Sequence, residues 1–292
     1  MNKKASPKLT LISSMTIFGT IALFIRKIPL PSAEIALYRA LISILLIGAY
    51  LLIKKQRIAF NKIKKELPLL LASGIAMGIN WIFLFEAYRY TSVSTATLSY
   101  YFAPVIVTVA APFIFKEKIR AKQIICFVMS TLGLVLITGI GSLENGSDII
   151  GILLGLGAAV FYATVILINK FIKSVDGINR TFLQFISSTF VLIPYVLLGE
   201  GINVTKINTV GLVCLLVIGV IHTAITYCMY FSSIKKLSGQ SVAILSYIDP
   251  LVAVAISVIF LKETMNAWQC LGGALILGFT LLNELPAKKK KS

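Results

Sequence analysis

Apolar residues run in long stretches along this chain, and short polar links separate them. A helix needs roughly 20 apolar residues to cross a hydrocarbon core of about 30 Å. By that length the pattern predicts ten membrane-spanning helices. The predicted spans are approximately 9–25, 33–53, 68–88, 93–115, 121–139, 150–170, 181–199, 209–233, 239–261 and 267–284.

The composition supports this interpretation. The chain has 292 residues, of which 58% are hydrophobic and 13% are charged, whereas a soluble domain carries about 25% charged residues. The sequence therefore predicts an all-α polytopic membrane protein. A net charge of +17 could indicate nucleic-acid binding, but the basic residues lie between the spans and not along one aromatic face, so no nucleic-acid partner is expected. The four cysteines all lie in apolar segments without a C-x-x-C spacing, and no metal site is expected.

Lysine and arginine are distributed unevenly between the two sides that ten spans define. Of the 28 basic residues, 22 fall on the side that holds both termini, 5 fall on the opposite side, and Arg39 lies within a span. Cytoplasmic loops carry the excess of positive charge. We therefore predict that both termini are cytoplasmic, that residues 285–292 form a basic cytoplasmic tail, and that the protein is integral to the cell membrane.

The chain repeats itself at half its length. Residues 93–117 recur as 239–263, where a shift of 146 positions superimposes Tyr101 on Tyr247, Pro104 on Pro250, and Glu117 on Glu263. An odd number of spans in each copy places the second copy upside down in the membrane. The link after the second copy has lost three of the four basic residues of the first, as an inverted repeat predicts. We predict two inverted five-helix repeats, 9–139 and 150–284.

These motifs resemble those of the drug/metabolite transporter superfamily, and within it the EamA-type permeases. The resemblance rests on Phe18-Gly19, on Ile25-Arg26-Lys27, on Pro31 with Glu34 and Arg39, and on the doubled proline-to-Lys-Glu block that contains Pro104 and Pro250. It implies a secondary transporter with two five-helix halves, often an exporter of amino acids or other metabolites. The sequence contains no G-x-x-x-x-G-K-[ST] phosphate loop, so no nucleotide cofactor is expected.

Pro104 and Pro250 lie near the middle of their spans and predict kinks, because proline lacks the N–H that an interior helical residue donates. Asp249 is a carboxylate at the predicted bilayer centre, where a charge costs roughly 2.5–3.5 kcal/mol on insertion scales. His222, the sole histidine, lies at similar depth. The two residues could form a proton-coupling pair, or each could contact substrate, or each could be bonded within the protein.

Arg39 lies within the second span, where it could pair with Glu86 or reach a substrate carboxylate. Aromatic and polar groups are concentrated on the same helices, and we expect them to line a substrate site between the repeats. These predicted substrate-binding residues are Asn80, Trp81, Tyr100, Tyr101, Tyr162, Tyr227, Tyr230, Ser246 and Tyr247.

The leading functional hypothesis is a secondary transporter of small metabolites that works by alternating access around a midplane site. One alternative is a flippase of lipid-linked metabolites with the same architecture. A membrane enzyme is the third, but one histidine and eleven acidic residues, mostly in loops, do not form a clustered catalytic set. The expected partners are therefore a small-molecule substrate and the lipid bilayer, with protons as a candidate coupling ion.

Overall fold

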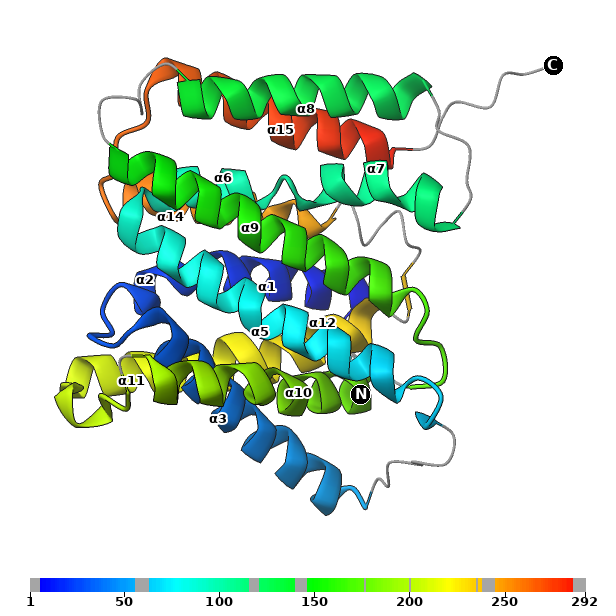
Figure 1. Cartoon of the computed structure of the whole chain (residues 1–292), viewed down its shortest axis with the longest axis vertical. Coiled ribbons are helices and arrows are strands. Elements are labelled where there is room, and N and C mark those ends of the chain that lie inside the picture. Colours follow the sequence, from blue (N-terminus) through cyan, green and yellow to red (C-terminus); the bar gives the residue numbers. More distant parts are fainter. Residues whose placement is uncertain are drawn as a thin grey trace.

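The computed structural model describes residues 6–55, 63–115, 121–139, 146–175, 177–199, 201–234, 236–237 and 245–285. These residues form helices and contain no strand. Figure 1 shows the helices running across the view in one elongated stack, with α8 and α15 at one edge and α3 near the other.

The helices follow the predicted spans closely. The first part of the chain forms α1 (Pro7–Gly19), α2 (Ile21–Ile25), α3 (Ser32–Ile53), α5 (Leu67–Tyr90), α6 (Val93–Tyr100), α7 (Ala103–Phe115) and α8 (Ala121–Gly139). The second part forms α9 (Gly146–Asn169), α10 (Gly177–Leu198), η1 (Val204–Lys206), α11 (Thr209–Val217), η2 (Ile218–Ile225), α12 (Thr226–Ile234), α14 (Ile248–Ile259) and α15 (Ala267–Glu284).

Six helical stretches are long and apolar enough to cross a membrane, and four shorter apolar helices accompany them in the described part of the chain. This confirms the prediction of an all-α polytopic membrane protein. The count of ten spans and the cytoplasmic position of the termini stay predictions. Residues 239–244 of the ninth predicted span, the link 116–120 and the predicted tail from 286 onward lie outside the described residues.

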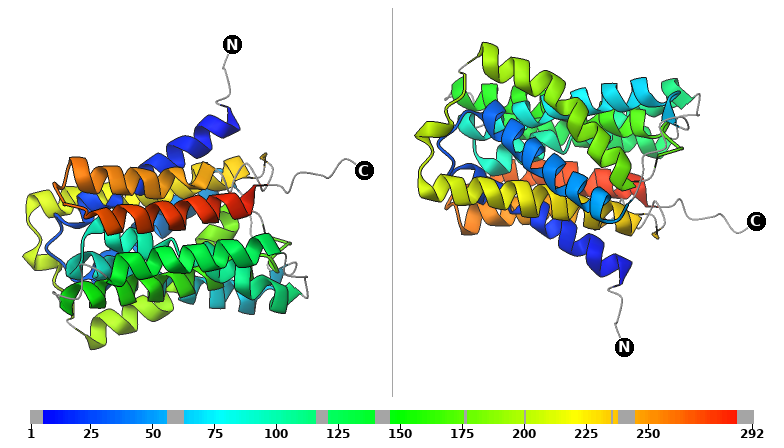
Figure 2. Two further views of the ribbon diagram at one scale, coloured as in Figure 1. Left: turned by 90° about the horizontal axis from the view of Figure 1, so that it is seen from above. Right: turned by 90° about the horizontal axis from the view of Figure 1, so that it is seen from below.

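Helix packing follows a pattern that recurs in the two parts of the chain. In the first part α5 packs against α9, and in the second α12 packs against α1; likewise α9 contacts α6 and α7, while α1 contacts α14. α3 packs on α10, and α8 lies along α15, which Figure 2 shows from above. Such reciprocal pairs are what a duplicated unit gives, and the division into 9–139 and 150–284 stays a prediction.

The bundle has two ends, and the described chain starts and finishes at one of them. Arg26, just after α2, contacts Glu263, just before α15, so these two helix ends lie together. α1 begins and α15 finishes at the opposite end, where the Lys122 Nζ donates to the Leu285 carbonyl at 2.5 Å. The end with Arg26 and Glu263 is called the predicted outer end below, because the charge distribution assigns it to the outside.

Both repeated prolines stand where a helix restarts. α6 ends at Tyr100, the Phe102 N–H donates to the Ser99 carbonyl at 3.2 Å, and α7 begins at Ala103 with Pro104 in its first turn. A turn at Tyr247 likewise precedes α14, whose first turn holds Pro250. The predicted bends are thus helix interruptions. Proline is well suited to a first turn, since that N–H has no intrahelical acceptor.

The eighth predicted span contains a π-helix, η2, which its uniform apolar sequence does not reveal. The Thr223 and Thr226 hydroxyls donate to the carbonyls of Ile218 and Ile221 at 2.9 and 2.6 Å. From α3, the Ser43 hydroxyl contacts the Gly219 carbonyl at 3.1 Å. Side chains thus help to satisfy the widened backbone, and π segments of this kind occur frequently at functional sites.

Glycines spaced four residues apart bring the long helices into close contact. A Cβ at Gly74 of α5 would lie 2.4 Å from both the Gln184 carbonyl oxygen and the Ser187 Cβ of α10. A Cβ at Gly151 of α9 would lie 2.5 Å from the Thr91 Cγ2. Small residues allow such approach in membranes, where van der Waals packing holds helices together.

We expect Gly74→Ala to lower the stability of the protein by about 1–3 kcal/mol, because the added methyl group meets α10 backbone that cannot move aside cheaply. The matched control is Gly278→Ala on α15, where a Cβ would meet nothing within 4 Å. The control should leave stability unchanged or raise it by up to about 1 kcal/mol through helix propensity. Thermal midpoints of the purified proteins in detergent measure the difference. Equal midpoints would contradict the close α5–α10 packing.

Candidate functional site

A row of aromatic rings crosses the middle of the bundle. Trp81 of α5 contacts Phe185 of α10 with ring centroids 5.5 Å apart, and Phe185 contacts Tyr227 of α12 at 5.3 Å. Tyr227 meets Phe18 of α1 edge to face at 5.0 Å, and Phe18 reaches Tyr230 at 6.4 Å. Rings from four helices therefore meet in one cluster. The three contacts that involve Phe18 or Tyr227 have the edge-to-face geometry that aromatic side chains prefer, and the Trp81–Phe185 contact is tilted.

A second aromatic group lies at the α6–α7 interruption. Tyr100 stacks on Tyr162 of α9 with centroids 5.1 Å apart and meets Tyr101 edge to face at 5.4 Å. The Tyr101 hydroxyl donates to the Asp249 Oδ2 in the first turn of α14. The two interrupted helices are therefore joined by a hydrogen bond between the residues beside their breaks.

The tyrosines of the two aromatic groups lie near two opposite charges, those of Arg39 and Asp249. Arg39 lies within electrostatic range of Tyr100 and Tyr227. Asp249 lies within range of the same two residues and of Tyr162. Six aromatic residues that were predicted to bind substrate thus lie around a guanidinium and a carboxylate. They are Trp81, Tyr100, Tyr101, Tyr162, Tyr227 and Tyr230.

Arg39 is 3% exposed and is held by neutral groups. Its Nε donates to the Thr223 Oγ1 of η2 at 3.0 Å, and its Cζ lies 4.3 Å from the Trp81 ring centroid and 5.2 Å from that of Phe85. A desolvated cation over an aromatic face gains about 2 kcal/mol. Within the described residues Arg39 makes no ion pair.

Of the two alternatives considered for Arg39, the described structure does not show the ion pair with Glu86. Glu86 instead accepts hydrogen bonds from the Arg89 Nη1 at 3.3 and 3.4 Å, one turn further along α5 and nearer the predicted outer end. Helical rise gave the depth of both residues but not their direction around the helix.

His222 and Asp249 are bonded to different groups. The His222 Nε2 lies 3.0 Å from the Thr20 Oγ1, its Nδ1 lies 3.4 Å from the Val217 carbonyl oxygen, and its ring packs on Phe24. His222 therefore joins η2 to the α1–α2 junction, and the direct His222–Asp249 bond considered from sequence is absent from the described contacts.

Asn80 is also engaged within the protein. Its Nδ2 donates to the Ala158 carbonyl of α9 at 2.6 Å, and the side chain is 3% exposed. Ser246 and Tyr247 precede α14 next to Asp249, with Tyr247 9% exposed. Asn80 thus joins α5 to α9 through its side-chain amide.

Glu263 forms a contact network at the predicted outer end. Its Oε1 lies 2.6 Å from the Arg26 Nη2, and its Oε2 accepts from the Val93 N–H at 2.8 Å and from the Ser257 hydroxyl. Ser94 donates to Ser257 at 2.6 Å. The network therefore ties α2, α6 and α14 together. The repeat of Lys-Glu in the sequence marked Glu263 but gave no partner for it.

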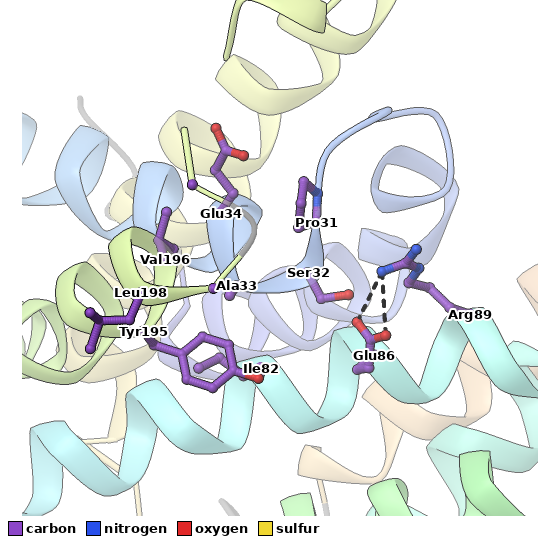
Figure 3. A pocket seen from close by; sticks show the side chains of 12 residues that line it. Pro31, Ser32, Ala33, Glu34, Ile82, Glu86, Arg89, Tyr195, Val196 and Leu198 are labelled. Carbon is purple, nitrogen blue, oxygen red and sulfur yellow. Dashed lines mark hydrogen bonds and ion pairs between the residues drawn. The ribbon is translucent and has the colours of Figure 1, made fainter. Parts of the chain in front are cut away.

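A cavity of about 420 Å³ also opens at the predicted outer end. The start of α3 and the ends of α5 and α10 surround it, with the Glu86–Arg89 pair on one side (Figure 3). The sequence gives no sign of this cavity, because the three segments that line it are far apart along the chain.

Broken helices that meet at a buried aromatic and polar centre, in an all-helical membrane bundle, are a recurring feature of membrane transporters. The EamA-like transporter family matches this chain twice, at residues 6–139 and 149–284. The chain belongs to the EamA-like transporter family. It is an integral membrane protein and a transporter, not an enzyme.

Relatives with transporter names cover nearly the whole chain. The "Uncharacterized transporter YxxF" of Bacillus subtilis (strain 168) is 32% identical over 280 residues, which is 94% of this chain and 88% of that protein. The "Threonine/homoserine exporter RhtA" of Escherichia coli (strain K12) is 25% identical over 284 residues, with 96% and 91% covered. A solved crystal structure at 14% identity shares the fold with a TM-score of 0.64, over 94% of this chain and 95% of the other.

We expect Arg26 and Glu263 to be energetically coupled. In a double-mutant cycle with Arg26→Gln and Glu263→Gln, the coupling free energy should be about 1 kcal/mol, because the pair is only partly exposed but still screened by water. The measurement is the thermal midpoint, in detergent, of the wild type, the two single variants and the double variant. The matched control is Lys27→Gln, an exposed neighbour of Arg26, whose effect should add to that of Glu263→Gln. Additive effects of Arg26 and Glu263 would show that the network does not hold the helices.

Proposed function

We propose that this transporter exports small amino acids by alternating access around the aromatic centre that lies between its two halves. A named relative is a threonine/homoserine exporter. The observation that carries the proposal is the buried Arg39, which has no ion pair in the described part of the chain. Arg39 and Asp249 both interact electrostatically with Tyr100 and Tyr227.

The zwitterion of an amino acid complements these two charges. Its carboxylate would pair with the planar guanidinium of Arg39, which suits carboxylate geometry. Its ammonium would contact Asp249 and the faces of the surrounding tyrosines, as cations do in aromatic sites. An unpaired charge inside a membrane protein is costly, so a substrate that supplies both counter-charges gains affinity from them.

The helix interruptions give a reason for motion at this centre. Asp249 and Tyr101 lie next to the breaks of two helices, and their hydrogen bond joins the first part of the chain to the second. A ligand that binds Asp249 competes with Tyr101 for the same carboxylate. Binding would thereby loosen the contact between the two interrupted helices, which is a step that alternating access requires. Protonation of Asp249 would act on the same bond, so protons remain our candidate coupling ion.

Asp249→Asn should lower the exchange of L-threonine by about tenfold or more, since a charged hydrogen-bond partner contributes roughly 1.5–3 kcal/mol. The assay is counterflow of labelled threonine into liposomes preloaded with unlabelled threonine, which needs no ion gradient. Asp148→Asn is the matched control, because Asp148 contacts Thr91 at the start of α9, apart from the aromatic rings. If Asp249→Asn exchanges threonine at the wild-type rate, Asp249 is not part of the site. If the wild-type protein exchanges no amino acid at all, the proposed function is refuted.

Arg39→Gln should discriminate between ligands with and without a carboxylate. We expect it to weaken inhibition of threonine counterflow by unlabelled homoserine by about tenfold, because a guanidinium–carboxylate pair is lost. Inhibition by 3-aminopropan-1-ol, the amine without the carboxylate, should change little. Both inhibitors are tested against the threonine counterflow that the Arg39→Gln variant retains. An equal loss for both would assign Arg39 to structure alone.

A further inference from the structure

The cavity at the predicted outer end has the size and lining of a small-molecule site. Its volume of about 420 Å³ falls within the range of roughly 300–1,000 Å³ that is usual for such sites. Ile82 of α5 forms an apolar wall with Val196 and Leu198 of α10, and polar groups lie at the end of α5 and at the start of α3. Figure 3 shows Ser32, Glu86 and Arg89 close to one another on that side.

Ser32 is a buried polar side chain that faces this cavity without a partner. It is 3% exposed, lines the cavity, and its hydroxyl makes no hydrogen bond in the described structure. Ser32 is also the first residue of α3, a helix of 22 residues whose Pro31 cap provides no side-chain hydrogen bond. The first turn of such a helix presents N–H groups and a partial positive charge, and both favour an anionic ligand.

Glu86 and Arg89 supply opposite charges at the rim. The side chains are 26% and 55% exposed, so both can reach a ligand from solvent. Glu34 also lines the cavity, but its oxygens already accept from the Asn203 N–H at 2.9 and 3.1 Å and from the Tyr38 hydroxyl at 2.9 Å. Glu34 points away from the Glu86–Arg89 pair in Figure 3 and serves to fix the loop after α10.

We infer that this cavity is a second amino-acid subsite, at which the transported molecule rests on its way to or from the outside. The carboxylate of the ligand contacts Arg89, the Ser32 hydroxyl and the first turn of α3. Its ammonium contacts Glu86, and its side chain lies against Ile82 and Val196. The inference rests on the proposed function for the identity of the ligand, but its residues are separate from the aromatic centre.

The test is direct binding of L-threonine to purified full-length protein in phosphatidylglycerol vesicles, measured by scintillation proximity. The protein carries Asp249→Asn, which weakens the central site and leaves the outer cavity as the main binding site. Adding Glu86→Gln or Arg89→Gln should weaken the remaining binding about tenfold, because each removes one charge-assisted contact. Ser32→Ala should weaken it by a smaller factor. Lys27→Gln removes an exposed cation at the same end, outside the cavity, and should change nothing.

Equal binding by Glu86→Gln, Arg89→Gln and Lys27→Gln would overturn the subsite, as would the loss of all threonine binding in Asp249→Asn alone. The proposed function would survive either result if the wild type still exchanged threonine. Conversely, binding that depends on Glu86 and Arg89 in a wild type without exchange would refute the proposed function and keep the subsite. Phosphatidylethanolamine carries the same two charges in its headgroup. Abolition of threonine binding by vesicles that contain it would assign the cavity to lipid and overturn the amino-acid assignment.

Discussion

The hydrocarbon core of a bilayer offers no hydrogen-bond partner, so every polar group within a span must be satisfied by the protein itself. This constraint decides where irregular backbone can lie. The Gly219 carbonyl of the π-helix accepts from Ser43 of α3, and the Ala158 carbonyl of α9 accepts from Asn80 of α5. Each bond joins neighbouring helices. The irregular backbone of the π-helix therefore lies against α3, whose Ser43 hydroxyl helps to satisfy it.

The same constraint shapes the charged centre. Arg39 is solvated by Thr223 and by two aromatic faces, and Asp249 by the hydroxyl of Tyr101. A direct Arg–Asp ion pair would satisfy both residues at once and would leave no reason for a ligand to bind. Neutral partners hold each charge in place at lower strength, so a zwitterionic substrate can replace them. In the proposed function, the separation of the two charges is thus the property that lets a zwitterion bind.

Much of this fold could be predicted from the sequence because its strongest signals are local. An apolar run of about 20 residues specifies a span without reference to any other segment, and Pro104 marks a place where a helix restarts. Contacts between distant segments left no such signal. Thr20 and His222 are 202 positions apart, and nothing in the sequence pairs them. The sequence likewise left the partner of Arg39 open between Glu86 and a substrate carboxylate, whereas Glu86 contacts Arg89 one turn away on its own helix.

The proposed central site and the proposed outer subsite each hold a carboxylate and a guanidinium, which are separated at the centre and paired at the rim. The surroundings of the two sites explain this difference. Glu86 and Arg89 lie in contact with water, where an exposed ion pair contributes only about 0–1 kcal/mol. A ligand can therefore separate them with little loss. Inside the bundle a contact pair would be much harder to open, because breaking it leaves an uncompensated buried charge. A paired arrangement at the rim and a separated arrangement at the centre both leave the charges available to an amino acid. In the proposed transport cycle, the environment of each site thus determines which arrangement of charges permits an amino acid to bind and leave.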